Sequence, residues 1–114
     1  MPRLLVIAHA PSDNLRRLRD AVIAGASHPD IGIELICKAP LDADAEDVLA
    51  ADAILLGTPE NFAYMSGALK DWFDRIYYPC LELKQGLPYA LYIRAGNDGQ
   101  GAKNSIEKIV TGLR

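Results

Sequence analysis

The chain has 114 residues and a net charge of −3. This length fits one domain over residues 1–114, and a composition that is 50% hydrophobic predicts a packed core rather than a disordered chain. The slight negative charge does not favour nucleic acid as a partner, and no apolar run approaches the roughly 20 residues that cross a bilayer.

The two cysteines, Cys37 and Cys80, are far apart and form no metal-ligand spacing with histidine. We therefore expect reduced thiols, a cytoplasmic location and no metal site. The amino terminus agrees with this expectation, because Met1–Arg3 leads into an apolar run that is too short for a signal peptide.

Residues 3–8 form a continuous apolar run, which is typical of a strand buried on both faces. Residues 9–14 follow as a turn. Apolar residues then recur at helical spacing over residues 15–26, with Ser12 or Asp13 as the expected N-cap.

Residues 31–37 alternate between apolar and other residues and predict a strand at the sheet edge, because one face carries Glu34. Residues 40–47 are an acidic loop that opens a short helix through residues 48–50. Acidic residues in a first helical turn suit the helix dipole, so we interpret them as a solvated cap.

A third strand is predicted at residues 53–56, followed by a loop at residues 58–66. The loop contains Phe62 and Tyr64, which can pack on a flat ligand. A helix follows with apolar residues at helical spacing, and we expect it to end near Tyr77 because Tyr78-Pro79 breaks it.

Residues 87–93 predict a fourth strand, residues 94–101 a glycine-rich loop, and the remaining residues a final helix. Strands that alternate with helices predict an α/β fold: a doubly wound parallel sheet of order 2-1-3-4 with helices on both faces. The strand at 87–93 would then be a bare edge, so we expect that a fifth strand is missing through C-terminal truncation, or that a partner covers the edge.

In this sheet order the loops at residues 9–14, 58–66 and 94–101 lie side by side at the carboxyl ends of the strands, where open α/β sheets bind ligands. The first loop enters a helix N-terminus, which favours an anion. Ser12 and Asn14 add a hydroxyl and an amide donor for a phosphate, although the same residue types also serve simply to cap helices.

The spacing of the glycines in the third loop excludes the dinucleotide-binding motif. Gly96, Gly99 and Gly101 are spaced as GxxGxG, which is not the dinucleotide-binding fingerprint GxGxxG, and the chain has no GxxxxGK[ST] motif. A phosphorylation receiver is also excluded, because the required aspartates do not follow the strands at 3–8 and 53–56.

Three segments carry a family resemblance: His9–Asn14, Gly57–Arg75 and Arg94–Gly101. The central segment follows the pattern T-P-x-x-F-x-x-M-S-x-x-L-K-x-F/W-x-D. On these residues the chain resembles the flavodoxin-like superfamily, and especially its NAD(P)H-dependent FMN reductase and quinone reductase branch. It departs from the family at Ala63, where glycine is common, and by ending before the family's fifth strand and helix.

The resemblance implies an FMN site with no catalytic side chain, because the flavin itself accepts hydride. The implied residues are Pro11, Ser12, Asn14 and Leu15 for the phosphate, Pro59, Glu60, Asn61 and Phe62 for the isoalloxazine ring, and Ala95, Gly96, Asn97 and Asp98 on its other side, with His9 and Thr58 beside them.

The function that the resemblance implies is an FMN-dependent oxidoreductase that passes electrons from NAD(P)H to a quinone, a flavin or a similar small acceptor. A homodimer is compatible with it. Two alternatives stay open: a flavodoxin-type electron carrier without direct reaction with NAD(P)H, and a domain of this fold that no longer binds FMN. The charge of −3 is only mildly acidic, which favours the enzyme over a carrier.

Overall fold

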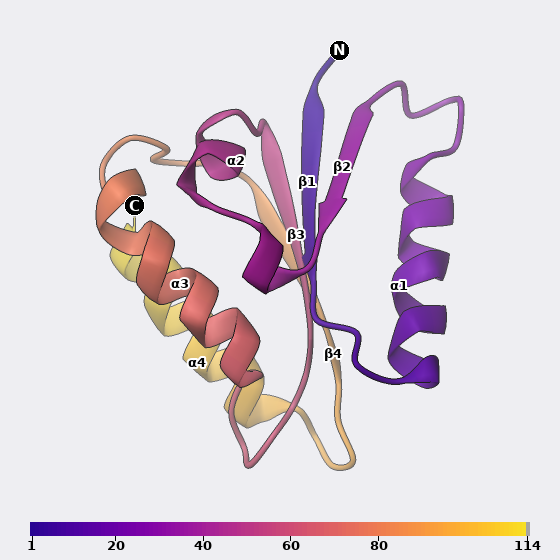
Figure 1. Ribbon diagram of the computed structural model, residues 1–114, viewed down its shortest axis with the longest axis vertical. Coiled ribbons are helices and arrows are strands. Elements are labelled where there is room, and N and C mark those ends of the chain that lie inside the picture. Colours follow the sequence, from indigo (N-terminus) through magenta and orange to yellow (C-terminus); the bar gives the residue numbers. More distant parts are fainter. Residues whose placement is uncertain (114) are drawn as a thin grey trace.

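A four-stranded parallel sheet carries the rest of the structure (Figure 1). The computed structural model describes residues 1–113. The strands are β1 (Arg3–Ala8), β2 (Glu34–Lys38), β3 (Ala53–Pro59) and β4 (Tyr89–Arg94), and their order is β2-β1-β3-β4. The predicted sheet order is therefore confirmed, and in the described part of the chain β4 is an edge strand.

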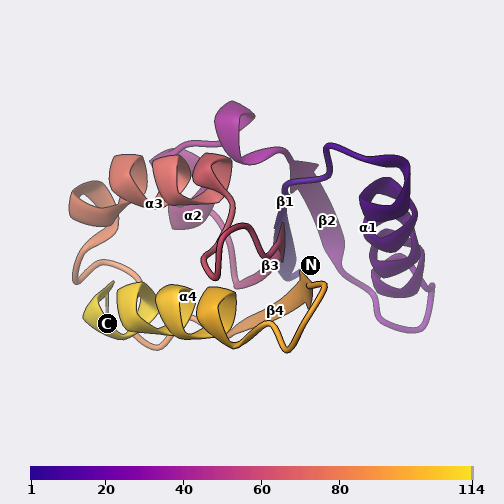
Figure 2. The same cartoon turned by 90° about the horizontal axis from the view of Figure 1, so that it is seen from below.

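Helices cover both faces of the sheet, as predicted (Figures 1 and 2). The first helix, α1, lies on one face, whereas the other helices lie on the opposite face. The connection from β1 to β2 runs in the opposite direction to the later connections, so right-handed crossovers place α1 by itself. The helices are α1 (Asp13–Ala26), α2 (Ala45–Leu49), α3 (Gly67–Cys80) and α4 (Gln100–Leu113), with a short 3-10 turn, η1 (Pro40–Asp42).

The hydrophobic core lies between the sheet and the α2–α4 layer. Alternate residues of β1 and β3 point into it and meet the apolar faces of α3 and α4. Trp72 and Phe73 pack with ring centroids 5.0 Å apart. Burying each side chain of this size stabilises the fold by about 1.5–3 kcal/mol. The central members are Leu5, Ile7, Ile54, Leu56, Leu69, Trp72, Phe73, Ile76 and Ile106.

The second strand is shorter at its start than predicted. It begins at Glu34 rather than at Ile31, because Gly32 has a φ of 64° and interrupts the extended backbone. Glu34 is also the first residue of β2 that pairs with β1, opposite Arg3. The predicted position of this strand at the sheet edge is confirmed.

The third strand is longer than predicted. Thr58 and Pro59 were expected in a loop, but they pair with Ile93 and Arg94 of β4. Proline has no backbone N–H to donate to the sheet, so it suits the last position of the strand. The loop therefore starts at Glu60 rather than at Thr58, and Glu60 N donates to the carbonyl of Arg94, the last residue of β4.

The prediction that Tyr78-Pro79 ends the third helix is also wrong, because α3 continues through Pro79 to Cys80. Pro79 cannot donate the hydrogen bond of its turn and its ring crowds the carbonyl one turn earlier, but its fixed φ suits the helix, which ends one residue later at Cys80. The acidic segment behaves as expected: the side chain of Asp44 caps α2 and forms a capping box with Asp47.

None of the helices in residues 1–113 is long and apolar enough to cross a membrane.

The pairing of Gly57 with Tyr92 generates a test of the sheet. A Cβ atom at Gly57 would lie 2.1 Å from the ring of Tyr92. We expect Gly57→Ala to lower the free energy of unfolding by about 1–3 kcal/mol through overpacking, measured by urea denaturation. Gly25→Ala is the matched control: nothing lies within 4 Å of its added Cβ, so it should leave stability unchanged or raise it by about 0.5–1 kcal/mol. Equal effects of the two changes would contradict the packing.

Candidate functional site

Three loops meet at the carboxyl edge of the sheet: the β1 loop (residues 9–12), the β3 loop (residues 60–66) and the β4 loop (residues 95–99). Backbone hydrogen bonds join them at their bases. His9 N donates to Gly57 O at 3.0 Å, and Glu60 N donates to Arg94 O at 2.9 Å. The structure thus brings together the loops whose proximity the sheet order predicted.

The β1 loop leads to the exposed N-terminus of α1. Ser12 is its N-cap, and the side-chain Oγ accepts a hydrogen bond from Leu15 N at 3.3 Å. The hydroxyl proton of Ser12 is still able to donate to a ligand. Pro11, Ser12 and Asn14 are exposed, whereas the side chain of Leu15 is buried in the protein.

Asp13 and Arg16 are charged residues in the first turn of this helix, and Arg16 Nη1 donates a hydrogen bond to Ala10 O of the β1 loop at 3.5 Å. Asp13 forms an ion pair with Arg16, so its carboxylate is partly neutralised at the point where an anion would bind. Burial lowers the pKa of His9, so its imidazole is neutral at pH 7 and brings no positive charge. The helix N-terminus therefore supplies attraction for an anion here, and the guanidinium of Arg16, which is paired with Asp13, is the positive side chain beside it.

Buried hydroxyl groups hold both ends of the β3 loop. Thr58 Oγ1 accepts a hydrogen bond from Ser66 N at 3.0 Å and donates to Pro59 O at 2.8 Å. Ser66 Oγ in turn accepts from Leu69 N at 3.2 Å and caps α3. Both hydroxyls are fully buried, so the side chain of Thr58 supports the loop from inside rather than lining its surface.

The tip of the β3 loop is a two-residue hairpin turn. Asn61 and Tyr64 exchange backbone hydrogen bonds of 2.9 and 3.0 Å. Phe62 and Ala63 between them have φ angles of 52° and 59°, the left-handed geometry of a type I′ turn that glycine and asparagine prefer. Phe62 is fully exposed at the tip. The turn therefore stores backbone strain while it presents an aromatic ring to solvent.

The hairpin rests on the N-terminus of α4. Glu60 Oε2 accepts a hydrogen bond from Ala102 N at 3.0 Å. A Cβ atom at Gly101 would lie 1.9 Å from Ala63 O, so only glycine permits this approach. The sequence pattern predicts a loop at Gly101 and does not indicate this contact, because its partners are distant in the chain.

The backbone donors of the site differ in availability. The N–H groups of Glu60 and Asn61 are used by Arg94 O and Tyr64 O, so they are not free for a ligand. Residues 96–98 of the β4 loop are exposed, and their N–H groups donate to no backbone carbonyl among residues 1–113. Asp98 uses its side chain to accept from Gln100 N at 3.0 Å at the start of α4.

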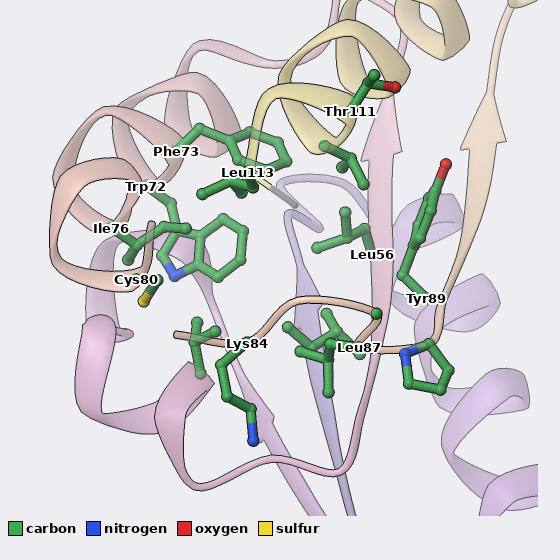
Figure 3. Close-up of a pocket in the computed structure, with 15 residues that line it drawn as sticks. Leu56, Trp72, Phe73, Ile76, Cys80, Lys84, Leu87, Tyr89, Thr111 and Leu113 are labelled. Atoms are coloured by element: carbon green, nitrogen blue, oxygen red, sulfur yellow. The ribbon is translucent and has the colours of Figure 1, made fainter. Parts of the chain in front are cut away.

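A separate cavity of about 370 Å³ lies at the opposite end of the fold, between α3, α4 and the amino ends of β3 and β4 (Figure 3). Its walls are mostly apolar, and Lys84 is the charged residue that lines it. No sequence pattern indicates this cavity, and none of the expected site residues lines it. Within residues 1–113, no group of three His, Cys, Asp or Glu side chains is placed to hold a metal ion.

Comparison with known proteins gives a family match. A family model described as NADPH-dependent FMN reductase matches residues 16–114. The matched range includes the β3 and β4 loops and begins after the β1 loop. Among curated proteins, the chain is similar to a flavodoxin from Aquifex aeolicus (strain VF5), with 33% identity over 76 residues, which are 67% of this chain and 40% of that protein. The chain thus matches less than half the length of this curated relative.

Solved structures of low sequence identity share the fold. An oxidoreductase from Corynebacterium diphtheriae superimposes with a TM-score of 0.74 at 17% identity, covering 100% of this chain and 76% of that one. A flavodoxin, WrbA-like protein from Agrobacterium tumefaciens gives 0.67 at 20% identity, covering 97% and 71%. An NADPH-quinone reductase from P. pentosaceus gives 0.61 at 18% identity, covering 99% and 79%.

The strained turn leads to a prediction about Ala63. Glycine removes the cost of a left-handed L-residue, about 1–2 kcal/mol, and adds about 0.5–1 kcal/mol of backbone entropy. Ala63→Gly should therefore raise the free energy of unfolding by up to about 1 kcal/mol in urea denaturation. Ala68→Gly, in the right-handed first turn of α3, is the matched control and should lose up to about 1 kcal/mol. A similar loss in both variants would show that Ala63 is unstrained.

Proposed function

The chain belongs to the NADPH-dependent FMN reductase family, and from this premise we propose that it binds FMN at the carboxyl edge of its sheet and acts as a flavin-dependent oxidoreductase. One observation carries the proposal: the open N-terminus of α1 and the exposed hairpin of the β3 loop stand at the same carboxyl edge of the parallel sheet. An anion site on the same edge of the sheet as an exposed aromatic turn suits a ligand with a phosphate at one end and a flat ring at the other.

The FMN phosphate is assigned to the N-terminus of α1. Three helices begin at this edge, but the N-terminus of α3 is capped by the buried Ser66 and that of α4 is occupied by the carboxylate of Glu60. The first turn of α1 is exposed and offers the hydroxyl of Ser12 and the amide of Asn14. Pro11 and the backbone of Leu15 complete this part of the proposed site.

The isoalloxazine ring is assigned to the space between the β3 and β4 loops. Phe62 is the exposed aromatic side chain at the turn, with Pro59, Glu60 and Asn61 forming the backbone beneath it. Ala95, Gly96, Asn97 and Asp98 close the other side. Nothing lies within 4 Å of a Cβ at Gly96, so the backbone there is open to a ligand. The free N–H groups of residues 96–98 are the better donors to a ring edge.

When bound, FMN supplies the hydride-accepting and electron-donating chemistry of the reaction. The protein then has to bind and orient the reactants, and no general acid or base is assigned. We propose NAD(P)H as the electron donor and a quinone, a flavin or a similar small molecule as the acceptor. Arg94, exposed at the end of β4, is placed to attract the phosphates of NAD(P)H. A homodimer stays a prediction.

A visible absorption spectrum under nitrogen tests the function. The purified chain is mixed with FMN, freed of unbound flavin and then treated with NADPH. We expect a retained flavin spectrum that NADPH bleaches. A chain that retains no flavin, even after incubation with excess FMN, would overturn the proposal.

A second candidate, a flavodoxin-type electron carrier, is favoured by the similarity to the Aquifex flavodoxin. The same experiment separates the two functions. A carrier would retain FMN but bleach with dithionite and not with NADPH. The mild net charge of −3 argues for the reductase, since a strongly acidic face is what steers carriers to their redox partners.

The phosphate assignment predicts a charge-dependent change in ligand preference. Aspartate caps helices as well as serine does, so Ser12→Asp should preserve α1 while it repels a phosphate. We expect FMN to bind this variant at least about tenfold more weakly, and riboflavin, which has no phosphate, to bind it as it binds the parent chain. Flavin fluorescence titrations measure both affinities. Equal weakening of FMN and riboflavin would place the phosphate elsewhere.

A further inference from the structure

We propose that Glu60 is a positioning residue, whose carboxylate holds the β3 loop on the N-terminus of α4 and so sets the distance between the two loops assigned to the flavin ring. The inference deepens the proposed function and rests on it for its consequence. Its structural basis is the set of contacts that Glu60 makes with the β4 loop and with α4.

Glu60 is attached to the β4 side of the site at two points. Its backbone N–H donates to Arg94 O at 2.9 Å, and its side-chain Oε2 accepts from Ala102 N at 3.0 Å. The second bond joins residues 42 positions apart in the chain and is partly buried. Together they fix both the main chain and the side chain of the residue that begins the hairpin.

A third contact holds the tip of the same hairpin. A Cβ atom on Gly101 would lie 1.9 Å from Ala63 O, so the turn packs directly on the first turn of α4. Because Phe62 and Ala63 are held in left-handed geometry, the turn is strained and needs support from outside. Glu60 and Gly101 provide that support on either side of it.

Electrostatics explains why an acidic residue suits this place. The first N–H groups of a helix have no partner inside the helix, and the helix dipole favours negative charge there. Asp98 accepts from Gln100 N, and Glu60 accepts from Ala102 N, so two carboxylates serve the start of α4. The N-terminus of α4 is thereby closed to the phosphate of a ligand, whereas that of α1 stays open.

The test uses three variants of the whole chain. Glu60→Ala removes the acceptor, Glu60→Gln keeps an acceptor oxygen but loses the charge, and Gly101→Ala pushes the hairpin away without changing Glu60. Glu46→Ala, an exposed glutamate on α2, is the matched control. Amide hydrogen exchange at Ala102, followed by NMR without FMN, reports the bond directly. Fluorescence titration with FMN reports its consequence.

We expect Glu60→Ala to speed amide exchange at Ala102 and to lower the affinity for FMN, each by about tenfold or more. Gly101→Ala should lower the affinity for FMN to a similar degree. Glu60→Gln should restore most of both properties, since an amide oxygen still accepts the bond. Glu46→Ala should behave as the parent chain in both measurements.

Two results would overturn the proposal. Unchanged exchange at Ala102 in Glu60→Ala would show that the bond does not hold the loop. Equal weakening of FMN binding by Glu60→Ala and Glu60→Gln, with exchange at Ala102 still slow in Glu60→Gln, would show that the charge acts on the ligand directly. If the parent chain binds no FMN, the proposed function fails, and the exchange measurement still decides whether Glu60 holds the β3 loop on α4.

Discussion

The buried hydroxyl of Thr58 connects the two ends of the β3 loop, and the geometry of the site depends on that connection. It accepts from Ser66 N and donates to Pro59 O, in a place that water does not reach. A buried amide left without its partner costs about 1–3 kcal/mol, so the hydrogen bond from Ser66 N to Thr58 stabilises the closed ends of the loop. Between these ends, Asn61 and Tyr64 pair in a hairpin that exposes Phe62 to solvent.

The three helix N-termini at the same edge differ in how their free N–H groups are capped. Ser66 satisfies that of α3 inside the protein, and the carboxylates of Glu60 and Asp98 satisfy that of α4. The N-terminus of α1, with its cap at Ser12, is the one that faces solvent. In the proposed complex the phosphate therefore takes the N-terminus of α1, and the flat ring takes the space between the β3 and β4 loops. This separation links the fold to the proposed binding of FMN.

Periodicity and topology were sufficient to predict the sheet order, the distribution of helices and the meeting of three loops, because each follows from local patterns and right-handed crossovers. The details of the site depend on contacts between distant residues. Gly57-Thr58-Pro59 has the composition of a turn, yet it becomes strand because Ile93 and Arg94 pair with it. The bond from Ala102 to Glu60 spans 42 positions, so no local pattern indicates it. The assignment of individual residues to FMN stays a prediction.

In the proposed complex one FMN molecule occupies both the N-terminus of α1 and the space between the β3 and β4 loops. Backbone amide shifts mapped by 1H–15N NMR during addition of FMN show whether it does, since each loop reports separately. We expect saturable shifts that cluster at residues 12–15, 60–64 and 95–98, all with a single dissociation constant. Shifts confined to the apolar cavity around Lys84, or no saturable shifts at all, would contradict it.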